Sequence, residues 1–191
     1  MIAIIDYGAG NANSVKNALG YLGKDSTITS DPEKILRADK VIFPGVGAFG
    51  DAMKELKKRK LDGAIKKFIQ SKKPFLGICI GLQVLFEESE ESPNVKGLGI
   101  LRGKVAKFAK GKIPQIGWNK IKSKTIGDGY AYFVNSYYAV PEDKKIIEST
   151  SDYYAKFTAA VKKENVFATQ FHLEKSGKFG LDILRKWLDA M

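Results

Sequence analysis

The sequence has very few of the residues that build disulfide or zinc frameworks. Its 191 residues include one cysteine, Cys79, and one histidine, His172. A single cysteine cannot form a disulfide within the chain, which is typical of proteins from a reducing compartment. One cysteine and one histidine are also too few for a Cys/His zinc site. We therefore expect neither a disulfide nor a bound metal.

Long apolar runs and internal repeats are absent as well. No stretch approaches the roughly 18 apolar residues of a membrane-spanning helix, and the apolar segment 2–5 is too short for a signal peptide. Apolar residues make up 44% of the chain and charged residues 28%, as in an ordinary globular protein. We expect a single domain over residues 1–191, located in the cytoplasm and without membrane contact.

The formal net charge of +11 raises the question of nucleic-acid binding. The lysines are scattered along helical segments, as Lys54, Lys57, Lys58 and Lys66 are, and do not gather in an arm or alternate with aromatic residues. A solvated lysine-rich surface or an acidic protein partner explains such a distribution. We expect no nucleic-acid partner; binding that weakens steeply with salt would indicate one.

Short apolar runs alternate with helical patterns over the first 90 residues. Buried strands are expected at 2–5, 41–43 and 75–78, with an edge strand at 25–29. A long helical stretch over 51–70, broken near 61–63, precedes the strand at 75–78. This alternation predicts an α/β fold of the flavodoxin-like, doubly wound kind, with a mostly parallel sheet and helices on both faces.

The second half of the chain has a different pattern. After Pro93, shorter β-like runs are joined by turn-rich segments, which predicts additional mixed or antiparallel strands. A final helix is expected to bury Ile183, Leu184, Trp187 and Leu188. The expected strands are 98–108, 118–122, 130–135, 146–149, 156–162 and 166–170, and the final helix is 179–190.

Cys79 lies where the strand 75–78 meets a helical pattern over 80–86. Gly77 precedes it by two residues and Gly81 follows by two. The pattern G-x-C-x-G is the thiol form of a nucleophile elbow, in which a sharp turn exposes the side chain above the sheet. A helix N-terminus favours the nucleophilic thiolate. The alternative is that Cys79 is a small buried hydrophobic residue.

Two glycine-rich turns follow other predicted strands. The first, 8–11, resembles a dinucleotide-binding turn, but Asn13 stands where that fingerprint requires its third glycine. The second, 44–50, is either a plain turn or a segment whose backbone amides face a developing negative charge. Because reactive groups gather at the carboxyl ends of parallel strands, both turns are expected beside Cys79.

His172 and Glu174 form a pattern of base and acid after the last predicted strand. In extended backbone the side chains of residues i and i+2 point the same way, so the carboxylate can accept a hydrogen bond from the imidazole. A histidine oriented by an acid completes a triad with a nucleophile. The alternative is a structural histidine, which is common at such positions.

Together these motifs resemble the triad class of glutamine amidotransferases, and within it the family of glutaminase subunits of imidazole glycerol phosphate synthase. The resemblance covers nearly the whole chain, in order. It is carried by Asp6-Tyr7-Gly8-Ala9-Gly10-Asn11, Pro44-Gly45-Val46-Gly47-Ala48-Phe49-Gly50, Gly77-Ile78-Cys79-Ile80-Gly81-Leu82-Gln83, Gly117-Trp118-Asn119, Phe133-Val134-Asn135-Ser136-Tyr137-Tyr138 and Gln170-Phe171-His172-Leu173-Glu174-Lys175-Ser176-Gly177.

The resemblance implies a Cys-His-Glu triad that hydrolyses glutamine to glutamate and ammonia. Cys79 would attack the carboxamide carbon, His172 would transfer protons, and Glu174 would orient His172. The oxyanion would be held by backbone amides at Val46, Gly47 and Ile80. The pocket for the rest of the glutamine would comprise Gly47, Gln83, Glu91, Ser136 and Tyr137.

The resemblance also implies a partner and no cofactor. In this family the ammonia passes to a cyclase subunit with a (β/α)8 barrel, and the heterodimer makes imidazole glycerol phosphate and aminoimidazole carboxamide ribonucleotide for histidine biosynthesis. By position, Asn11, Tyr138 and Lys175 are candidates for the interface.

The chain departs from the family pattern at three positions, and other functions are open. Leu173 replaces a usual proline between His172 and Glu174, and Gln115 and Asn135 stand where relatives often have histidines. One alternative is the glutaminase subunit of another ammonia-channelling synthase, such as pyridoxal phosphate synthase. Another is a flavodoxin-like domain without enzymatic activity, in which Cys79 is a redox-sensitive thiol.

Overall fold

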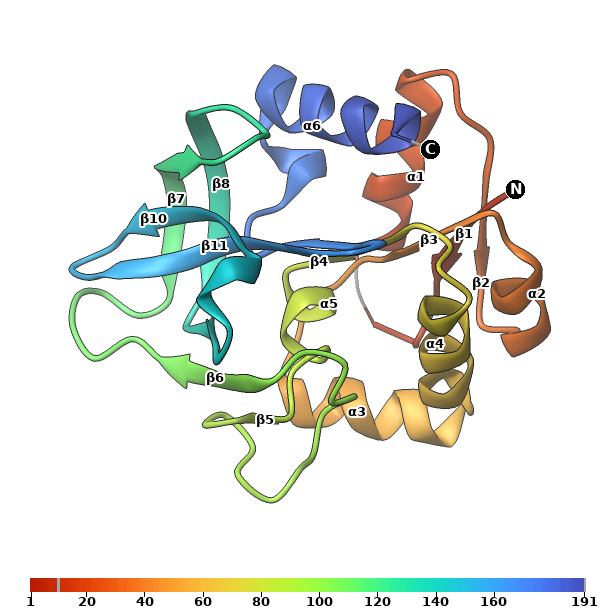
Figure 1. The fold of residues 1–191 in the computed structure, drawn as a ribbon, viewed down its shortest axis with the longest axis horizontal. Coiled ribbons are helices and arrows are strands. Elements are labelled where there is room, and N and C mark those ends of the chain that lie inside the picture. Colours follow the sequence, from red (N-terminus) through yellow and green to blue (C-terminus); the bar gives the residue numbers. More distant parts are fainter. Residues whose placement is uncertain (10, 191) are drawn as a thin grey trace.

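The computed structural model describes residues 1–9 and 11–190 and has the layered arrangement of an α/β protein (Figure 1). The strands are β1 (Ile2–Ile5), β2 (Ser26–Thr29), β3 (Lys40–Phe43), β4 (Phe75–Ile78), β5 (Glu88–Ser89), β6 (Gly103–Lys107), β7 (Gln115–Ser123), β8 (Gly129–Asn135), β9 (Tyr137–Pro141), β10 (Ile147–Asp152), β11 (Lys156–Lys163) and β12 (Val166–Thr169). The α-helices are α1 (Ala12–Tyr21), α2 (Pro32–Arg37), α3 (Phe49–Lys58), α4 (Leu61–Gln70), α5 (Ile80–Gln83) and α6 (Gly177–Asp189), and the 3-10 helices are η1 (Lys144–Ile146) and η2 (Leu173–Lys175).

One nine-stranded sheet runs through the molecule in the order β2-β1-β3-β4-β12-β11-β10-β7-β8. The strands from β2 to β12 in this order are parallel, and those from β12 to β8 are antiparallel. The expected fold class, a parallel sheet extended by antiparallel strands from the second half of the chain, is confirmed. β12 returns from the second half to lie beside β4, which brings the segment after β12 next to Cys79.

Helices cover both faces of this sheet, which explains why its central strands are apolar throughout. Figure 1 shows α1 and α6 on one face and α2, α3, α4 and α5 on the other. Successive strand residues join different layers: Val41 and Phe43 pack with α3 and α4, whereas Ile42 packs with α1 and α6. Burying one such side chain contributes about 1.5–3 kcal/mol before the entropy of ordering is deducted. The site therefore rests on a rigid, doubly covered sheet.

Local signals in the sequence explain where some helices begin and end, but not others. Asp31 caps α2 by accepting from the Glu33 amide, with Pro32 in the first turn. The helical stretch 51–70 begins earlier, at Phe49, and breaks earlier than expected, because Lys60 takes a left-handed conformation with φ 58°. The expected helix 80–86 is shorter, ending at Gln83.

A second sheet of three strands, β5-β6-β9, was not expected. β6 replaces the long strand predicted over 98–108, and β9 follows β8 after one intervening residue. β6 pairs with β9 in antiparallel fashion and with the two-residue β5 in parallel. This sheet lies outside the main sheet, below it in Figure 1.

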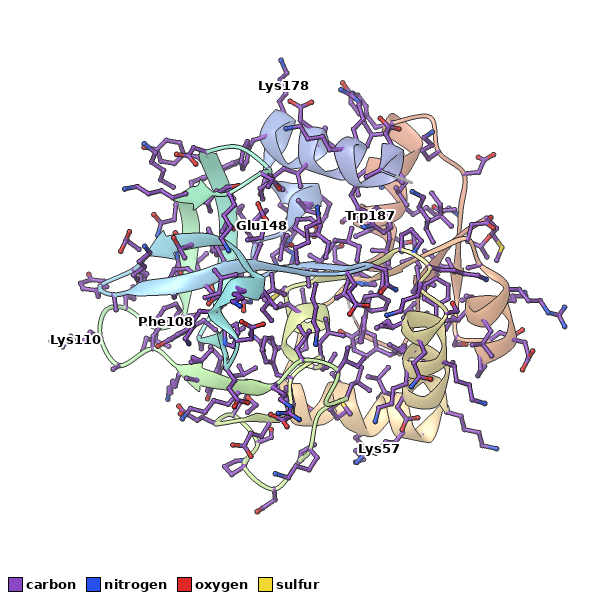
Figure 2. All side chains as sticks on the ribbon, in the orientation of Figure 1. Lys57, Phe108, Lys110, Glu148, Lys178 and Trp187 are labelled. Carbon is purple, nitrogen blue, oxygen red and sulfur yellow. The ribbon has the colours of Figure 1, made fainter. Side chains whose placement is uncertain are left out.

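Charged side chains are distributed over the whole surface. Lys57, Lys110 and Lys178 project outward from different sides, whereas Phe108 and Trp187 lie inside (Figure 2). This arrangement is a solvated lysine-rich surface. Within residues 1–9 and 11–190, none of the helices has the length and hydropathy to cross a membrane.

Candidate active site

Cys79 occupies a strained corner between β4 and α5. Its φ of 54° and ψ of −105° lie outside the regions that L-residues favour, a conformation that costs about 1–3 kcal/mol. A hydrogen bond from the Cys79 amide to the Thr169 carbonyl, 2.7 Å long, holds the corner against β12. The turn expected from the G-x-C-x-G pattern is present.

The two glycines beside Cys79 are required by close backbone contacts. A Cβ atom on Gly77 would lie 2.5 Å from the Gly81 carbonyl oxygen, and one on Gly81 would lie 2.2 Å from the Phe43 carbonyl oxygen. Any side chain at either position would push α5 away from the sheet. The glycines therefore let the start of α5 approach the end of β3, where the second glycine-rich turn begins.

His172 and Glu174 are in direct contact and almost fully buried. Nδ1 of His172 lies 2.8 Å from Oε1 of Glu174, and the two side chains are 1% and 2% exposed. The backbone differs from the extended segment that the sequence suggested: His172 is extended, but Glu174 lies in the 3-10 helix η2. The tight turn still brings the side chains of residues i and i+2 together, so the carboxylate fixes the orientation of the imidazole.

Cys79 contributes to the electrostatics of the His172 ring. Burial lowers the pKa of His172, but the hydrogen-bonding and charge effects of Cys79 and Glu174 outweigh it and raise the pKa to about 10. Nε2 makes no hydrogen bond of standard geometry within the described residues, although the Cys79 sulfur is near enough to affect the ring. The site therefore favours the imidazolium form of His172.

Gln170 is a further contact of the Cys79 sulfur that the sequence did not single out. It is completely buried, and its Nε2 lies 3.6 Å from the sulfur. Its Oε1 accepts a hydrogen bond from Gln83 Nε2 at 3.1 Å, which fixes the direction of the amide. An N–H directed at sulfur stabilises a thiolate. The only sequence signal was its place two residues before His172.

A cleft of about 230 Å³ opens above Cys79 and His172. It brings together the end of β4, the second glycine-rich turn, the β8–β9 connection and η2. Among the predicted residues it is lined by Val46, Gly47, Cys79, Gln83, Glu91, Ser136, Tyr137, His172 and Lys175, and it also includes Pro114, Val134 and Asn135.

The predicted oxyanion residues surround the elbow in different ways. Gly47 has a φ of 115°, which a glycine adopts readily, and Val46 is 39% exposed at the cleft. The Tyr7 hydroxyl donates to the Val46 carbonyl at 2.8 Å, so this turn has a fixed backbone direction. Ile80 packs its side chain against Gly45, and its amide lies at the N-terminus of α5.

The predicted glutamine-binding residues form one connected group. Gln83 Nε2 donates to the Tyr137 carbonyl at 3.2 Å, which ties the β8–β9 connection, including Ser136, to α5. Glu91 Oε2 accepts from the Phe49 amide at 2.7 Å, at the start of α3. The Glu91 carboxylate thus caps a helix as well as lining the cleft, an arrangement that the sequence did not reveal.

The three candidate interface residues lie in different environments. Lys175 is exposed at the cleft. Asn11 contacts the triad, since its Nδ2 lies 3.5 Å from Glu174 Oε1. Tyr138 is half-buried and packs on Phe108, with ring centroids 4.8 Å apart. Gly10, part of the motif that contains Asn11, lies outside the described residues.

The three residues that depart from the family pattern are all buried. Leu173 is fully buried against the core beside α6. Gln115 and Asn135 are partners across β7 and β8, and both are buried. Their side-chain oxygens have no hydrogen-bond partner within the described residues. Asn135 lines the cleft, whereas Gln115 lines a separate hollow beside Ile116 and Trp118.

Comparisons with known proteins identify the family of the chain. The family profile of glutamine amidotransferase class-I matches residues 3–191. Imidazole glycerol phosphate synthase subunit HisH 1 of Methanococcus maripaludis is 45% identical, with all of both chains covered. Subunit HisH of Methanothermobacter thermautotrophicus is 47% identical, covering 100% of this chain and 99% of that protein.

Two further similarities concern a longer protein and a solved structure. Imidazole glycerol phosphate synthase hisHF of Arabidopsis thaliana is 44% identical over 98% of this chain, which corresponds to 34% of that protein. A crystal structure of a glutamine amidotransferase has a TM-score of 0.83 at 18% identity, covering 99% of this chain and 98% of that one, and shows the same fold. The chain belongs to the class-I glutamine amidotransferase family.

Proposed function

We propose that this chain is the glutaminase subunit of an imidazole glycerol phosphate synthase and acts as one domain in the cytoplasm. It hydrolyses glutamine to glutamate and ammonia for a partner subunit. The observation that carries the proposal is that buried His172, paired with Glu174, lines one cleft together with the strained Cys79. Relatives of 45–47% identity over their full or nearly full length bear this synthase name.

In the first half of the reaction, the Cys79 thiolate attacks the carboxamide carbon of glutamine. Backbone amides at Gly47 and Ile80 stabilise the oxyanion that forms. The His172 imidazolium then gives its proton to the amide nitrogen, the carbon–nitrogen bond breaks, and ammonia leaves a γ-glutamyl thioester on Cys79. Glu174 keeps the Nδ1–H of His172 directed away from the substrate, so that Nε2 carries the transferred proton.

In the second half, water replaces ammonia at the same position. Neutral His172 takes a proton from the water as its oxygen attacks the thioester carbon. The tetrahedral intermediate collapses, the carbon–sulfur bond breaks, and glutamate leaves with its carboxyl proton passing to solvent. The thiolate and imidazolium are then restored. Gln170 supports the thiolate in both halves, because its amide N–H is directed at the sulfur.

The remainder of glutamine is held by the residues around the cleft. The backbone of Ser136 and Tyr137, fixed by Gln83, provides polar groups for the amino-acid end of the substrate. The Glu91 carboxylate attracts the substrate ammonium, although one of its oxygens already accepts from the Phe49 amide. These groups select glutamine by its charged end and leave the carboxamide beside Cys79.

A partner subunit receives the ammonia, and we propose that it is a cyclase with a (β/α)8 barrel. The word subunit in the relatives' names, and the relative in which an equivalent of this chain makes up 34% of a longer synthase, support a heteromeric assembly. The interface candidates in this assembly are Lys175, which lines the cleft, Asn11, which contacts Glu174, and Tyr138.

An exposed apolar surface offers the contact area for that partner. Ile116, Trp118 and Tyr130 are 63%, 56% and 61% exposed on β7 and β8. Ile116 pairs across the sheet with Val134, which lines the cleft, so the surface is continuous with the active site. Exposed large apolar groups of this kind are typical of interaction sites.

The proposal is tested by measuring glutamate formation by this chain with and without a barrel cyclase and its nucleotide substrate. We expect slow turnover alone, strong stimulation by the partner and its ligand, and none with Cys79→Ala. Trp118→Ala should keep the slow basal turnover and lose stimulation. Activity of Cys79→Ala equal to the parent chain would rule out the thiol mechanism. Stimulation by an unrelated synthase partner, and not by the cyclase, would assign the chain to a different synthase.

A further inference from the structure

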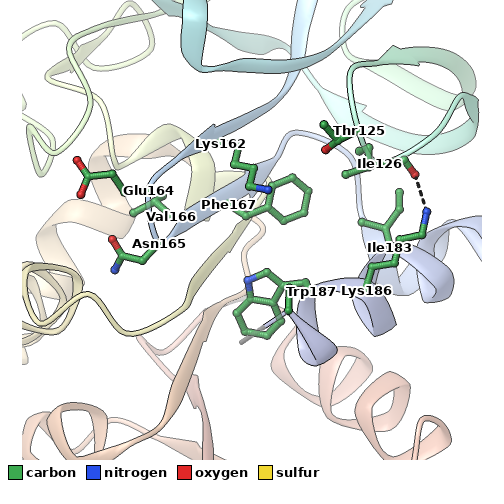
Figure 3. Close-up of a pocket in the computed structure, with 11 residues that line it drawn as sticks. Thr125, Ile126, Lys162, Glu164, Asn165, Val166, Phe167, Ile183, Lys186 and Trp187 are labelled. Carbon is green, nitrogen blue, oxygen red and sulfur yellow. Dashed lines mark hydrogen bonds between the residues drawn. The ribbon is translucent and has the colours of Figure 1, made fainter.

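A second cavity, of about 430 Å³, lies between α6 and the β11–β12 hairpin (Figure 3). It shares no lining residue with the cleft above Cys79. Val166, at the start of β12, lines this cavity, whereas Thr169, at the end of the same strand, contacts the Cys79 amide. The two sites are therefore at opposite ends of β12.

The inner wall of the cavity is apolar and structurally fixed. Val166 and Phe167 come from β12, and Ile183 and Trp187 come from successive turns of α6. All four side chains are buried within the core and are less than 10% exposed. A cavity of this size lined by aliphatic and aromatic groups is typical of sites for small apolar molecules.

Most polar groups at the rim are already satisfied within the protein. Glu164 forms an ion pair with Lys72. The Asn165 amide donates to the carbonyls of Ile69 at 3.0 Å and Lys73 at 2.7 Å. The Thr125 hydroxyl is 3.0 Å from Glu148. These groups have little remaining capacity to bind a ligand.

Two ammonium groups at the rim do have such capacity. The Lys162 ammonium forms no hydrogen bond or ion pair within the described residues. Lys186 has one long hydrogen bond, 3.4 Å, to the Ile126 carbonyl and no acidic partner in that part of the chain. Figure 3 shows them on opposite sides of the cavity, Lys162 from β11 and Lys186 from α6. The cavity thus combines an apolar wall with unneutralised positive charge at its edge.

We propose that this cavity binds a small apolar carboxylate. The hydrocarbon part of the ligand packs against Phe167, Ile183 and Trp187, and its carboxylate pairs with Lys162 and Lys186. An uncharged ligand of the same shape would leave both ammonium groups without a partner, and a compact inorganic anion would leave the apolar wall uncovered. The site does not depend on the glutaminase reaction, since its lining residues are distinct from those of the cleft above Cys79.

The test uses 3-phenylpropionate as the probe and 3-phenylpropionamide as its uncharged counterpart. The chain has two tryptophans, so Trp118→Phe leaves Trp187 as the only indole, and its fluorescence reports binding in the cavity. We expect saturable binding of the carboxylate with a dissociation constant below about 1 mM and at least about tenfold weaker binding of the amide.

Substitutions on exposed positions test the contacts without threatening the fold. Lys162→Met and Lys186→Met should each weaken carboxylate binding by about threefold to tenfold. Lys178→Met is the matched control: it removes one charge from α6 at an exposed position outside the cavity and should leave binding unchanged. Equal affinity for acid and amide, no saturable signal, or equal effects of the three substitutions would overturn the proposal.

Discussion

Gly81→Ala is expected to destabilise the protein because the added Cβ atom would clash with a neighbouring backbone carbonyl. The added Cβ would lie 2.2 Å from the Phe43 carbonyl oxygen, whereas real Cβ contacts essentially never fall below 3.0 Å. Neither group can yield alone, because Phe43 belongs to the central strand β3 and Gly81 to α5. The two elements must separate, and β3 carries the second glycine-rich turn at its end. Overpacking of this kind costs about 1–3 kcal/mol and sometimes more.

Gly63→Ala provides the matched control. Gly63 also lies in a helix, α4, but an added Cβ would meet nothing within 4 Å. Alanine is the better helix former by about 0.5–1 kcal/mol, which acts in favour of both variants. We therefore expect Gly63→Ala to gain about 0.5–1 kcal/mol and Gly81→Ala to lose about 1–2 kcal/mol net.

Thermal unfolding measures the difference between the two variants. For a chain of this size, 1 kcal/mol corresponds to about 2–4 °C in Tm. Gly63→Ala should unfold a few degrees above the parent chain and Gly81→Ala a few degrees below it. Glutaminase activity should fall only in Gly81→Ala, because the shift moves the glycine-rich turn away from Cys79. A Gly81→Ala protein as stable and active as Gly63→Ala would refute the reasoning from this contact.

Three further predictions concern the triad. Glu174→Gln keeps the size of the side chain but loses the charge opposite Nδ1 of His172, so kcat should fall by about 10²–10⁴ with little change in KM. A decrease in kcat of less than about threefold in steady-state assays would contradict the orienting role of Glu174. Asn11→Ala removes the 3.5 Å contact to Glu174 and a hydrogen bond from the Ser14 hydroxyl, so kcat should fall by less than about tenfold. A loss as large as that of Glu174→Gln would show that Asn11 has a direct role. The pKa of His172 is 6.5 unfolded and about 10 folded, so its protonation contributes stability that is complete below pH 6.5 and lost as pH rises toward 10. In urea titrations, the unfolding free energy of the parent chain should therefore fall relative to that of His172→Gln as the pH rises from 7 to 10. A difference between the two proteins that does not change with pH would contradict the raised pKa of His172.

The parts of the fold that follow from local chemistry were accessible from the sequence. The apolar runs predicted the parallel strands, because a strand covered on both faces needs apolar residues throughout. The glycines around Cys79 predicted its sharp turn, since only residues without a Cβ fit that close approach. The proximity of His172 and Glu174 was also expected, although a 3-10 turn and not an extended segment produces it.

Features that depend on long-range packing were not accessible. The pairing of β6 with β9 joins residues at least 30 positions apart, and no local pattern specifies that partner. The contact of Asn11 with Glu174 spans 163 residues. Gln170 follows directly after β12, and its direction toward the Cys79 sulfur is set by Gln83 on α5. The contact between Gln170 and Cys79 follows only from the pairing of β12 with β4, which the sequence does not specify.

The most direct measurement of the central claim is the mass of the peptide that contains Cys79 during turnover. Acid quenching while glutamine is being hydrolysed, followed by digestion and mass spectrometry, should reveal a γ-glutamyl group attached to Cys79. The adduct should be absent without glutamine. Formation of glutamate at the full rate with Cys79 always unmodified, and retained in Cys79→Ala, would contradict the account.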